Sequence, residues 1–237
     1  MAERKSDSGL TAEERQELEA ECTLWRIAEL RINPVRGNFD VEHLREINRR
    51  IFQDLPDLGF DDVTPGQYRP PVRLDSDWCK YRQLASQNVI LAVAYSRMDL
   101  DAINQLNNAL KKANPAELSK LKTAEFTEAM GRLYVDLDYI HPFRDGNSRS
   151  LREFTRQLAE ESGYSLDWER FNKNIYGRDV LYIARDKSVN QLACPSILDP
   201  EIKRDVAFSM DALTPNRDMP DLLRDAILPA RERNQGN

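Results

Sequence analysis

The chain has 237 residues, of which 41% are hydrophobic and 31% charged, the balance of a globular protein that folds without disulfides or a structural metal. Its 40 acidic and 34 basic side chains give a net charge of -6, which argues against nucleic acid as a partner, because binding phosphate backbones needs a basic face. No stretch approaches the roughly 18 apolar residues of a membrane span, and three dispersed cysteines without a signal peptide predict reduced thiols in the cytoplasm.

Helical signals dominate the first third of the chain. Thr11 opens a capping box, and the helix that follows is predicted to end at the Asn-Pro pair at 33–34. Asp40 is predicted to cap a second helix with one apolar face. Residues 56–75 contain several prolines and glycines and are predicted to be irregular, with a Pro-Gly turn at 65–66 that could close a short hairpin.

Helical periodicity resumes at Trp78 and continues past Val89, and a shorter helix is predicted over 101–113. The clearest helix runs from about 123 to 140, with apolar residues at steps of four and three, and another follows from about Ser148. Weaker helical segments are predicted near 167–176, 178–190, 199–213 and 220–228. The predicted fold class is therefore all-α or nearly so.

The scarce residue types exclude common sites. Because His43 and His141 are the two histidines, an HExxH zinc site is impossible. The nine glycines form neither GxGxxG nor GxxxxGK(S/T), so a Rossmann turn and a P-loop are both absent from the sequence. A nucleotide would have to be bound by another route.

The segment HPFRDGNSR, from His141 to Arg149, joins the two strongest helices. His141 ends the first helix and is a candidate base. Phe143 is an apolar side chain in a polar loop, and we expect it to anchor the loop to the core. Asp145 is a hard oxygen ligand suited to a Mg²⁺ that also binds phosphate.

The second half of this segment favours anion binding. Gly146 and Asn147 favour a turn with positive φ, which directs backbone N–H groups into one concavity at the N-terminus of the next helix. Arg149 and Arg152 lie three residues apart, so both project from one face of that helix. A base beside a polyphosphate site predicts group transfer to an incoming hydroxyl.

HPFRDGNSR resembles the Fic motif, HPFx(D/E)GN(G/K)R, and Arg152 matches a second arginine that some members carry. The wider resemblance covers about residues 20–190, including GNFDVEHLREINRRIFQDL. It implies a helical bundle with the motif between two central helices and a small β-hairpin flap that binds a target segment by strand addition. Residues 60–75 are the expected flap. The expected organisation is a disordered tail at 1–10, a Fic domain with its N-terminal helix at 11–195, a helical extension at 196–228 and a tail at 229–237.

The resemblance also implies an activity: Mg²⁺-dependent transfer of AMP from ATP to a Ser, Thr or Tyr hydroxyl of a target protein. His141 would be the general base, and Asp145 would hold Mg²⁺ on the α- and β-phosphates. The phosphates would be cradled or gripped by Gly146, Asn147, Ser148, Arg149 and Arg152. Asn172 and Tyr176 are candidates for contacts to adenine.

Ser148 departs from the family pattern, which has glycine there. A member with a bulkier residue at this place binds its nucleotide reversed and acts as a kinase. Because serine is small, AMP transfer is favoured. The alternatives are a Doc-like kinase that transfers the γ-phosphate and a non-catalytic nucleotide-binding scaffold.

A second departure concerns regulation. Many members carry an inhibitory helix with (S/T)xxxE(G/N), whose glutamate occupies an arginine of the motif, but no Glu-Gly or Glu-Asn dipeptide occurs in this chain. We therefore expect no built-in inhibition. A separate antitoxin that supplies the inhibitory glutamate, or an effector delivered into another cell, is the expected arrangement.

Overall fold

The computed structural model describes residues 10–86, 89–213 and 216–230, so most of the two predicted tails lies outside the described residues. The first two helices begin where their caps predict. In α1 (Ala12–Ile32), Thr11 and Glu14 form the reciprocal capping box, with Thr11 Oγ1 accepting from the Glu14 N–H and the Glu14 carboxylate accepting from the Thr11 N–H. In α2 (Val41–Phe52), the Asp40 side chain is the N-cap. Both predictions are confirmed.

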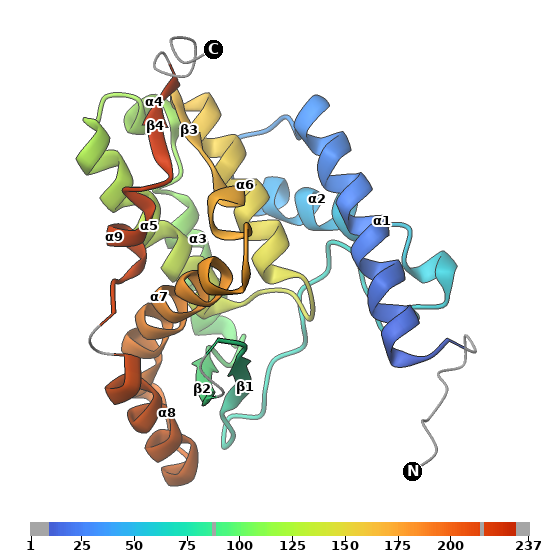
Figure 1. Ribbon diagram of the computed structural model, residues 1–237, viewed down its shortest axis with the longest axis vertical. Coiled ribbons are helices and arrows are strands. Elements are labelled where there is room, and N and C mark those ends of the chain that lie inside the picture. The colour runs from blue at the N-terminus through green and yellow to red at the C-terminus, as the bar shows by residue number, and fades with distance from the viewer. Residues whose placement is uncertain (1–9, 87–88, 214–215, 231–237) are drawn as a thin grey trace.

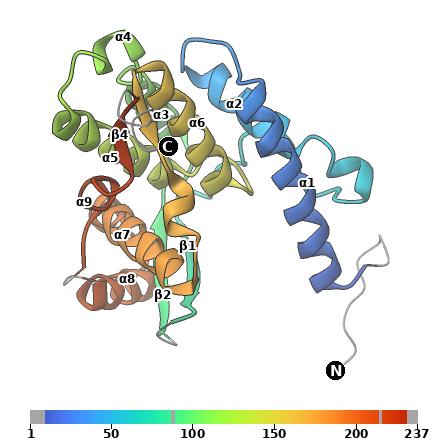
Figure 2. The ribbon, with the colours of Figure 1, turned by 45° about the horizontal axis from the view of Figure 1, so that its top comes forward.

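The two helices that flank the motif occupy the centre of the molecule. They are α5 (Thr123–Ile140) and α6 (Asn147–Glu161), and Figures 1 and 2 place α1 and α2 on one side of α6 and α5, α7 and α9 on the other. The apolar stripe predicted for α5 is confirmed, since its members are 0–3% exposed: Phe126, Met130, Leu133, Leu137 and Ile140. The remaining helices are α3 (Leu100–Leu110), α4 (Pro115–Leu118), α7 (Ile175–Ala193), α8 (Pro200–Leu213) and α9 (Met219–Leu223).

An antiparallel hairpin lies next to the end of α5, although the sequence pattern predicted a helix there. Its strands are β1 (Trp78–Leu84) and β2 (Val89–Tyr95), with Trp78 paired to Tyr95 and Leu84 to Val89. The helix prediction from Trp78 was wrong because the continuous apolar run VILAVAY has no period that separates strand from buried helix. Its β-branched and aromatic residues fit a strand packed against α7 and α8.

The assignment of the flap to residues 60–75 was therefore also wrong. Within that range only Tyr68 forms a β-bridge, with Phe143, and the Arg69 N–H donates to the Pro142 carbonyl at 2.9 Å. Pro65, Pro70 and Pro71 in this range lack the backbone N–H groups that pairing between β-strands requires. The segment instead lies along the beginning of the HPFRDGNSR loop.

Two further helix predictions near the C-terminus were wrong in part. The helix predicted near 167–176 is a short 3₁₀ helix over Trp168–Phe171, with α7 beginning only at Ile175. The helix predicted near 220–228 is the short α9 followed by β4 (Ile227–Pro229), which pairs antiparallel with the unpredicted strand β3 (Tyr164–Leu166). Three-residue strands paired across some sixty positions leave no local period to read. The region from α9 to β4 packs into the same core as α5, and a Cβ added to Gly131 would lie 2.6 Å from the Pro220 Cα. In the described part of the chain, no helix combines the length and apolar character needed to cross a membrane.

Candidate active site

His141 is the C-cap of α5 and has left-handed backbone angles, φ 50° and ψ 59°. Such angles are uncommon outside glycine and persist where surrounding contacts hold them. The His141 N–H donates to the Leu137 carbonyl at 3.1 Å, and the His141 carbonyl accepts from Arg69 Nε at 2.8 Å. Arg69 and Ser96 also bind the preceding Ile140 carbonyl. The end of α5 is therefore fixed by side chains from two other segments.

The imidazole of His141 is buried between the aromatic rings of Trp78 and Tyr95, with centroids 5.2 and 4.1 Å away. Its Nε2 lies 3.4 Å from Lys80 Nζ, and its Nδ1 lies 3.4 Å from Asp138 Oδ1. Burial lowers the pKa of His141 to about 4, against the opposing effect of Asp138. The ring is therefore neutral at neutral pH, which is the state a general base needs.

The side chains of Phe143 and Asn147 stabilise the conformation of the loop after His141. Phe143 is 1% exposed and belongs to the main hydrophobic core. The Asn147 side chain joins the two ends of the loop: its Oδ1 accepts from the Phe143 N–H at 2.9 Å and its Nδ2 donates to the Phe143 carbonyl at 2.6 Å. The Asn147 side chain thus stabilises the backbone conformation of the loop by hydrogen bonds.

The N-terminus of α6 opens at the predicted turn. Gly146 has φ 72° and is the N-cap, and the Ser150 N–H donates to the Gly146 carbonyl at 3.0 Å. The N–H groups of the first turn, which includes Ser148, have no acceptor within the helix and make a ready anion site.

Arg149 is bound by α1. It forms an ion pair with Glu19 and donates to Thr23 Oγ1 at 2.9 Å, and its guanidinium lies over the Phe52 ring. Arg152 Nε donates to the Ser148 carbonyl at 3.2 Å. A phosphate that binds Arg149 would have to replace the Glu19 carboxylate, so the expectation that nothing within this chain blocks the motif is not met at Arg149.

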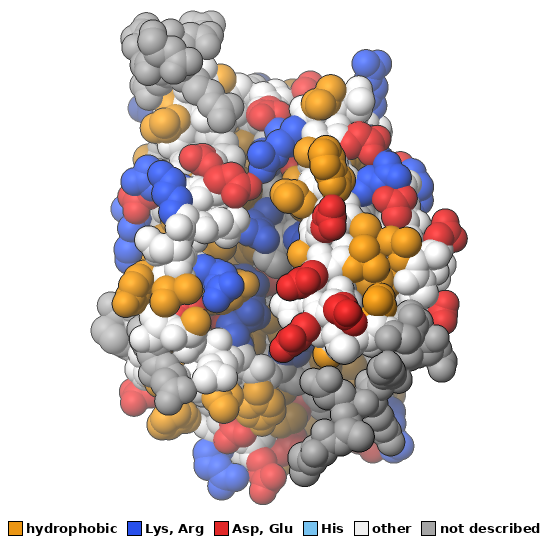
Figure 3. Space-filling view, turned by 45° about the vertical axis from the view of Figure 1, so that its right-hand side comes forward, with side chains coloured by type: hydrophobic (Ala, Val, Ile, Leu, Met, Phe, Trp, Pro, Cys, Tyr) orange, Lys and Arg blue, Asp and Glu red, His pale blue; other side chains and the backbone are white. Residues whose placement is uncertain are grey.

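Arg149 and Arg152 line a cavity of about 690 Å³ between α1, α6 and residues 166–172. Figure 3 shows basic side chains inside a hollow on this side of the molecule and acidic side chains on the ridge beside it. Asn172 also lines the cavity, whereas Tyr176 is not among its lining residues. Of the two adenine candidates, the structure brings only Asn172 to the arginines.

Asp145 is exposed in the loop, and no group of three or more His, Cys, Asp or Glu side chains able to hold a metal occurs among the described residues. A single carboxylate still fits Mg²⁺, because this ion is commonly held by one or two carboxylates together with substrate phosphates and water. Asp145 could hold the metal only jointly with the nucleotide.

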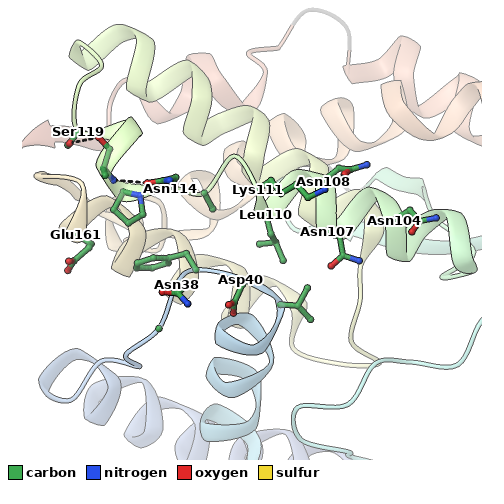
Figure 4. A pocket seen from close by; sticks show the side chains of 16 residues that line it. Asn38, Asp40, Asn104, Asn107, Asn108, Leu110, Lys111, Asn114, Ser119 and Glu161 are labelled. Carbon is green, nitrogen blue, oxygen red and sulfur yellow. Dashed lines mark hydrogen bonds between the residues drawn. The ribbon is translucent and has the colours of Figure 1, made fainter.

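A larger cavity, about 1190 Å³, lies elsewhere, between residues 37–41, α3 and α4. Figure 4 shows that amide side chains surround it, including Asn38, Asn104, Asn107, Asn108 and Asn114. None of the predicted site residues lines it, so it is separate from the candidate active site.

A buried imidazole, followed along one loop by the open N-terminus of a helix, is an arrangement typical of proteins that bind polyphosphates and abstract a proton. The Fic/DOC family model matches residues 38–159, which include the whole motif from His141 to Arg152. The chain belongs to the Fic/DOC family.

Two curated relatives carry names that describe an activity. The protein adenylyltransferase VbhT of Bartonella schoenbuchensis is 30% identical over 148 residues, covering 62% of this chain and 27% of VbhT. The probable protein adenylyltransferase Fic of Escherichia coli is 30% identical over 179 residues, covering 71% of this chain and 74% of that protein. The match thus spans about a quarter of VbhT and about three quarters of the second relative.

Solved structures share the fold. An N-terminal Fic domain of a Bep effector from Bartonella quintana, with bound ADP, aligns with a TM-score of 0.64 and 20% identity, covering 99% of this chain and 94% of that one. BepC from Bartonella tribocorum, with bound AMPPNP, has a TM-score of 0.61 and 18% identity, covering 97% and 94%. These likenesses confirm the predicted Fic-type helical fold.

Four residues at the site were not predicted from the sequence: Asp138, Lys80 and Arg69, which contact His141, and Glu19, which pairs with Arg149. Asp138 had a local signal, because it lies three residues before His141 on a helix and therefore on the same face. The other three come from segments far away in sequence, and no local pattern connects them to the motif.

Proposed function

We propose that this chain transfers AMP from ATP to a hydroxyl side chain of a target protein. The observation that carries the proposal is the buried neutral ring of His141 at the start of the loop that leads to the open N–H groups of α6. The target hydroxyl would give its proton to His141 as the hydroxyl oxygen bonds to the α-phosphorus of ATP. The bond between the α-phosphorus and the oxygen that bridges to the β-phosphorus would break, and pyrophosphate would leave. Asp145 would hold Mg²⁺, which neutralises charge on the phosphates.

The phosphates would lie against the first turn of α6, where the backbone of Gly146 and Ser148 would contact them. Arg149 and Arg152 would bind the outer phosphates. Asn147 would act through the loop shape that its side chain maintains. The cavity lined by Arg152 and Asn172 offers the rest of the nucleotide a place beside these groups.

The target segment would pair with the free edge of β1. Within the described residues β1 forms a sheet with β2 and with no other strand, and such an edge strand can accept a further strand. Trp78 and Lys80 on β1 both contact His141, which puts an added strand next to the base. An acceptor Ser, Thr or Tyr on that strand would be delivered to the imidazole.

The test is a transfer experiment with ATP labelled either at the α- or at the γ-phosphate, in the presence of Mg²⁺ and a cell lysate. Label on protein from the α-position supports AMP transfer. Label from the γ-position alone would establish the kinase alternative raised by Ser148. If neither label moves while ATP still raises the melting temperature, the chain is a non-catalytic scaffold.

Glu19→Gln is expected to lower the KM for ATP, because the neutral amide releases Arg149 for the phosphates. Both partners of this ion pair are partly exposed, so the expected effect is about fivefold. Glu17→Gln, an exposed change on the same helix, is the matched control and should leave KM unaltered. An unchanged KM in Glu19→Gln would contradict competition between Glu19 and phosphate.

A separate inhibitory protein is part of the same proposal. Next to the arginine-lined cavity, α1 exposes Leu24 and Trp25, at 67% and 71%. An antitoxin helix with an apolar face and one glutamate would cover these side chains and reach Arg152, which carries no carboxylate in the ion pairs found among the described residues. Its binding would then exclude ATP.

Transfer activity is expected to persist well below the ordinary pKa of histidine, 6.5, because burial lowers the pKa of His141 to about 4. Protonation removes the base, so activity should fall only as the pH drops below about 5. Among the groups facing the ring, Asp138 raises its pKa and Lys80 and Arg185 lower it. The initial rate of α-label transfer, measured from about pH 4 to about pH 8, checks this, and an acid limb centred near 6.5 would contradict it.

A further inference from the structure

A chain of buried charges leads away from His141 into the protein. The Asp138 carboxylate lies 3.1 Å from Arg185 Nε on α7. Arg185 Nη2 also lies 2.9 Å from Asp186 Oδ1, and Asp186 Oδ2 accepts from Arg82 Nε of β1 at 2.9 Å. The side chains of Asp138 and Asp186 are 0% exposed and that of Arg185 is 3% exposed.

Arg185 keeps Asp138 ionised despite this burial. Burial by itself would raise the pKa of the Asp138 carboxyl, but the charge of Arg185 together with His141 and Arg82 outweighs it, and the pKa lies below its ordinary value. An ionised carboxylate accepts hydrogen bonds and cannot donate them. Whatever faces Asp138 must therefore carry the proton.

The group that faces it is Nδ1 of His141, at 3.4 Å. On the opposite side of the ring, Nε2 lies 3.4 Å from the Lys80 ammonium, which donates and cannot accept. The two neighbours therefore select the same tautomer: the proton is on Nδ1 and the lone pair is on Nε2.

We propose that Asp138 is a positioning residue that holds His141 in the Nδ1–H tautomer, with Arg185 as the counter-charge that keeps Asp138 ionised. Nε2 is then the atom that takes the proton of the target hydroxyl. This last statement rests on the proposed function, whereas the tautomer itself does not.

His43 supplies an internal reference because it has the opposite arrangement. Its Nε2 lies 3.3 Å from Gln157 Oε1, and Gln157 Nε2 donates to Glu153 Oε1 at 2.8 Å, which fixes the amide with its oxygen towards His43. His43 is therefore the Nε2–H tautomer. The chain has two histidines, and the structure assigns one tautomer to each.

The test is nitrogen NMR of full-length protein labelled with ¹⁵N in histidine, with His141→Ala used to assign the signals. At neutral pH, His141 is expected to show a protonated Nδ1 and His43 a protonated Nε2. A protonated Nε2 on His141 in the unmodified protein overturns the proposal.

Asp138→Asn should weaken the selection of the Nδ1–H tautomer of His141. Arg185 can only donate, so the new amide turns its oxygen to Arg185 and its NH₂ group to Nδ1, while the Lys80 ammonium still needs a lone pair on Nε2. The two donors then compete for the ring, and a fraction of the Nε2–H tautomer should appear. Asp186→Asn is the matched control, since it makes the same change in an equally buried partner of Arg185 and leaves Asp138 in place. It should leave the tautomer of His141 as it is.

The kinetic readout separates positioning from folding. Asp138→Asn is expected to lower kcat for AMP transfer about 10²- to 10⁴-fold with little change in the KM for ATP. Asp186→Asn should lower the melting temperature comparably but kcat far less. Equal losses of kcat in the two variants, with the His141 tautomer kept in both, would make Asp138 merely structural. If the unmodified protein transfers no label, the proposed function fails, and the nitrogen spectra still decide the tautomer.

Discussion

His141→Ala is expected to reduce transfer of α-label to protein by about 10²- to 10⁴-fold, the range that a positioned general base contributes. Lys80 lies next to His141 Nε2 but cannot readily replace the imidazole, because its ammonium must lose a proton first, although burial lowers its pKa. ATP should still raise the melting temperature of this variant, because the N–H groups of α6 and both arginines remain. The measurement is the initial rate of labelling at saturating ATP.

His43→Gln is the control, since it removes the other imidazole of the chain. His43 is 3% exposed, stacks on Phe39 with centroids 4.3 Å apart, and lies outside the candidate site. It should lower the melting temperature and, at a temperature where the protein stays folded, retain most of the transfer rate. Loss of transfer in His43→Gln equal to that in His141→Ala would contradict the assignment of the base.

Gly146→Ala is expected to lower the free energy of unfolding by about 3 kcal/mol or more and to abolish the stabilisation by ATP. Two effects add at this position. The backbone has φ 72°, where side chains are strained, and a Cβ would lie 1.8 Å from Cζ of Phe52, a side chain that is 2% exposed and has no free space to enter. Relief of the clash would move the loop that holds the phosphates.

Gly163→Ala separates these two effects. Gly163 has φ 83°, yet a Cβ there would meet nothing within 4 Å, so only the backbone strain of about 1 kcal/mol is expected. Urea unfolding of both variants gives the comparison, and ATP should stabilise Gly163→Ala as it does the unmodified protein. Equal losses of stability in the two variants would show that the contact with Phe52 costs little.

The elements with local signals could be predicted from the sequence. The capping box at Thr11 and the side chain of Asp40 fix helix starts within a few residues, and the stripe from Phe126 to Ile140 has the helical period throughout. The HPFRDGNSR loop could be predicted equally well, because its proline, glycine and asparagine specify the chain path between two helices. In the structure Phe143 is buried, and Gly146 has the positive φ that the turn requires.

The hairpin and the surroundings of the base could not be predicted in this way. Val89–Tyr95 forms a strand because α7 and α8 cover it, which is a tertiary effect on an ambiguous apolar run. Lys80, Arg185 and Glu19 reach the site from β1, α7 and α1, and a charged residue in a sequence does not indicate a partner that lies dozens of positions away.

The pairing of Asp138 with Arg185 also decides where the chain can be shortened. The match to the family model ends at residue 159, but Arg185 lies beyond it, on α7. A fragment cut at the end of α6 would contain every residue of HPFRDGNSR and Arg152, yet it would leave Asp138 with a buried and uncompensated charge next to the base. We therefore expect the smallest working unit of this protein to extend at least to Arg185, because the ion pair between α5 and α7 compensates the charge of Asp138.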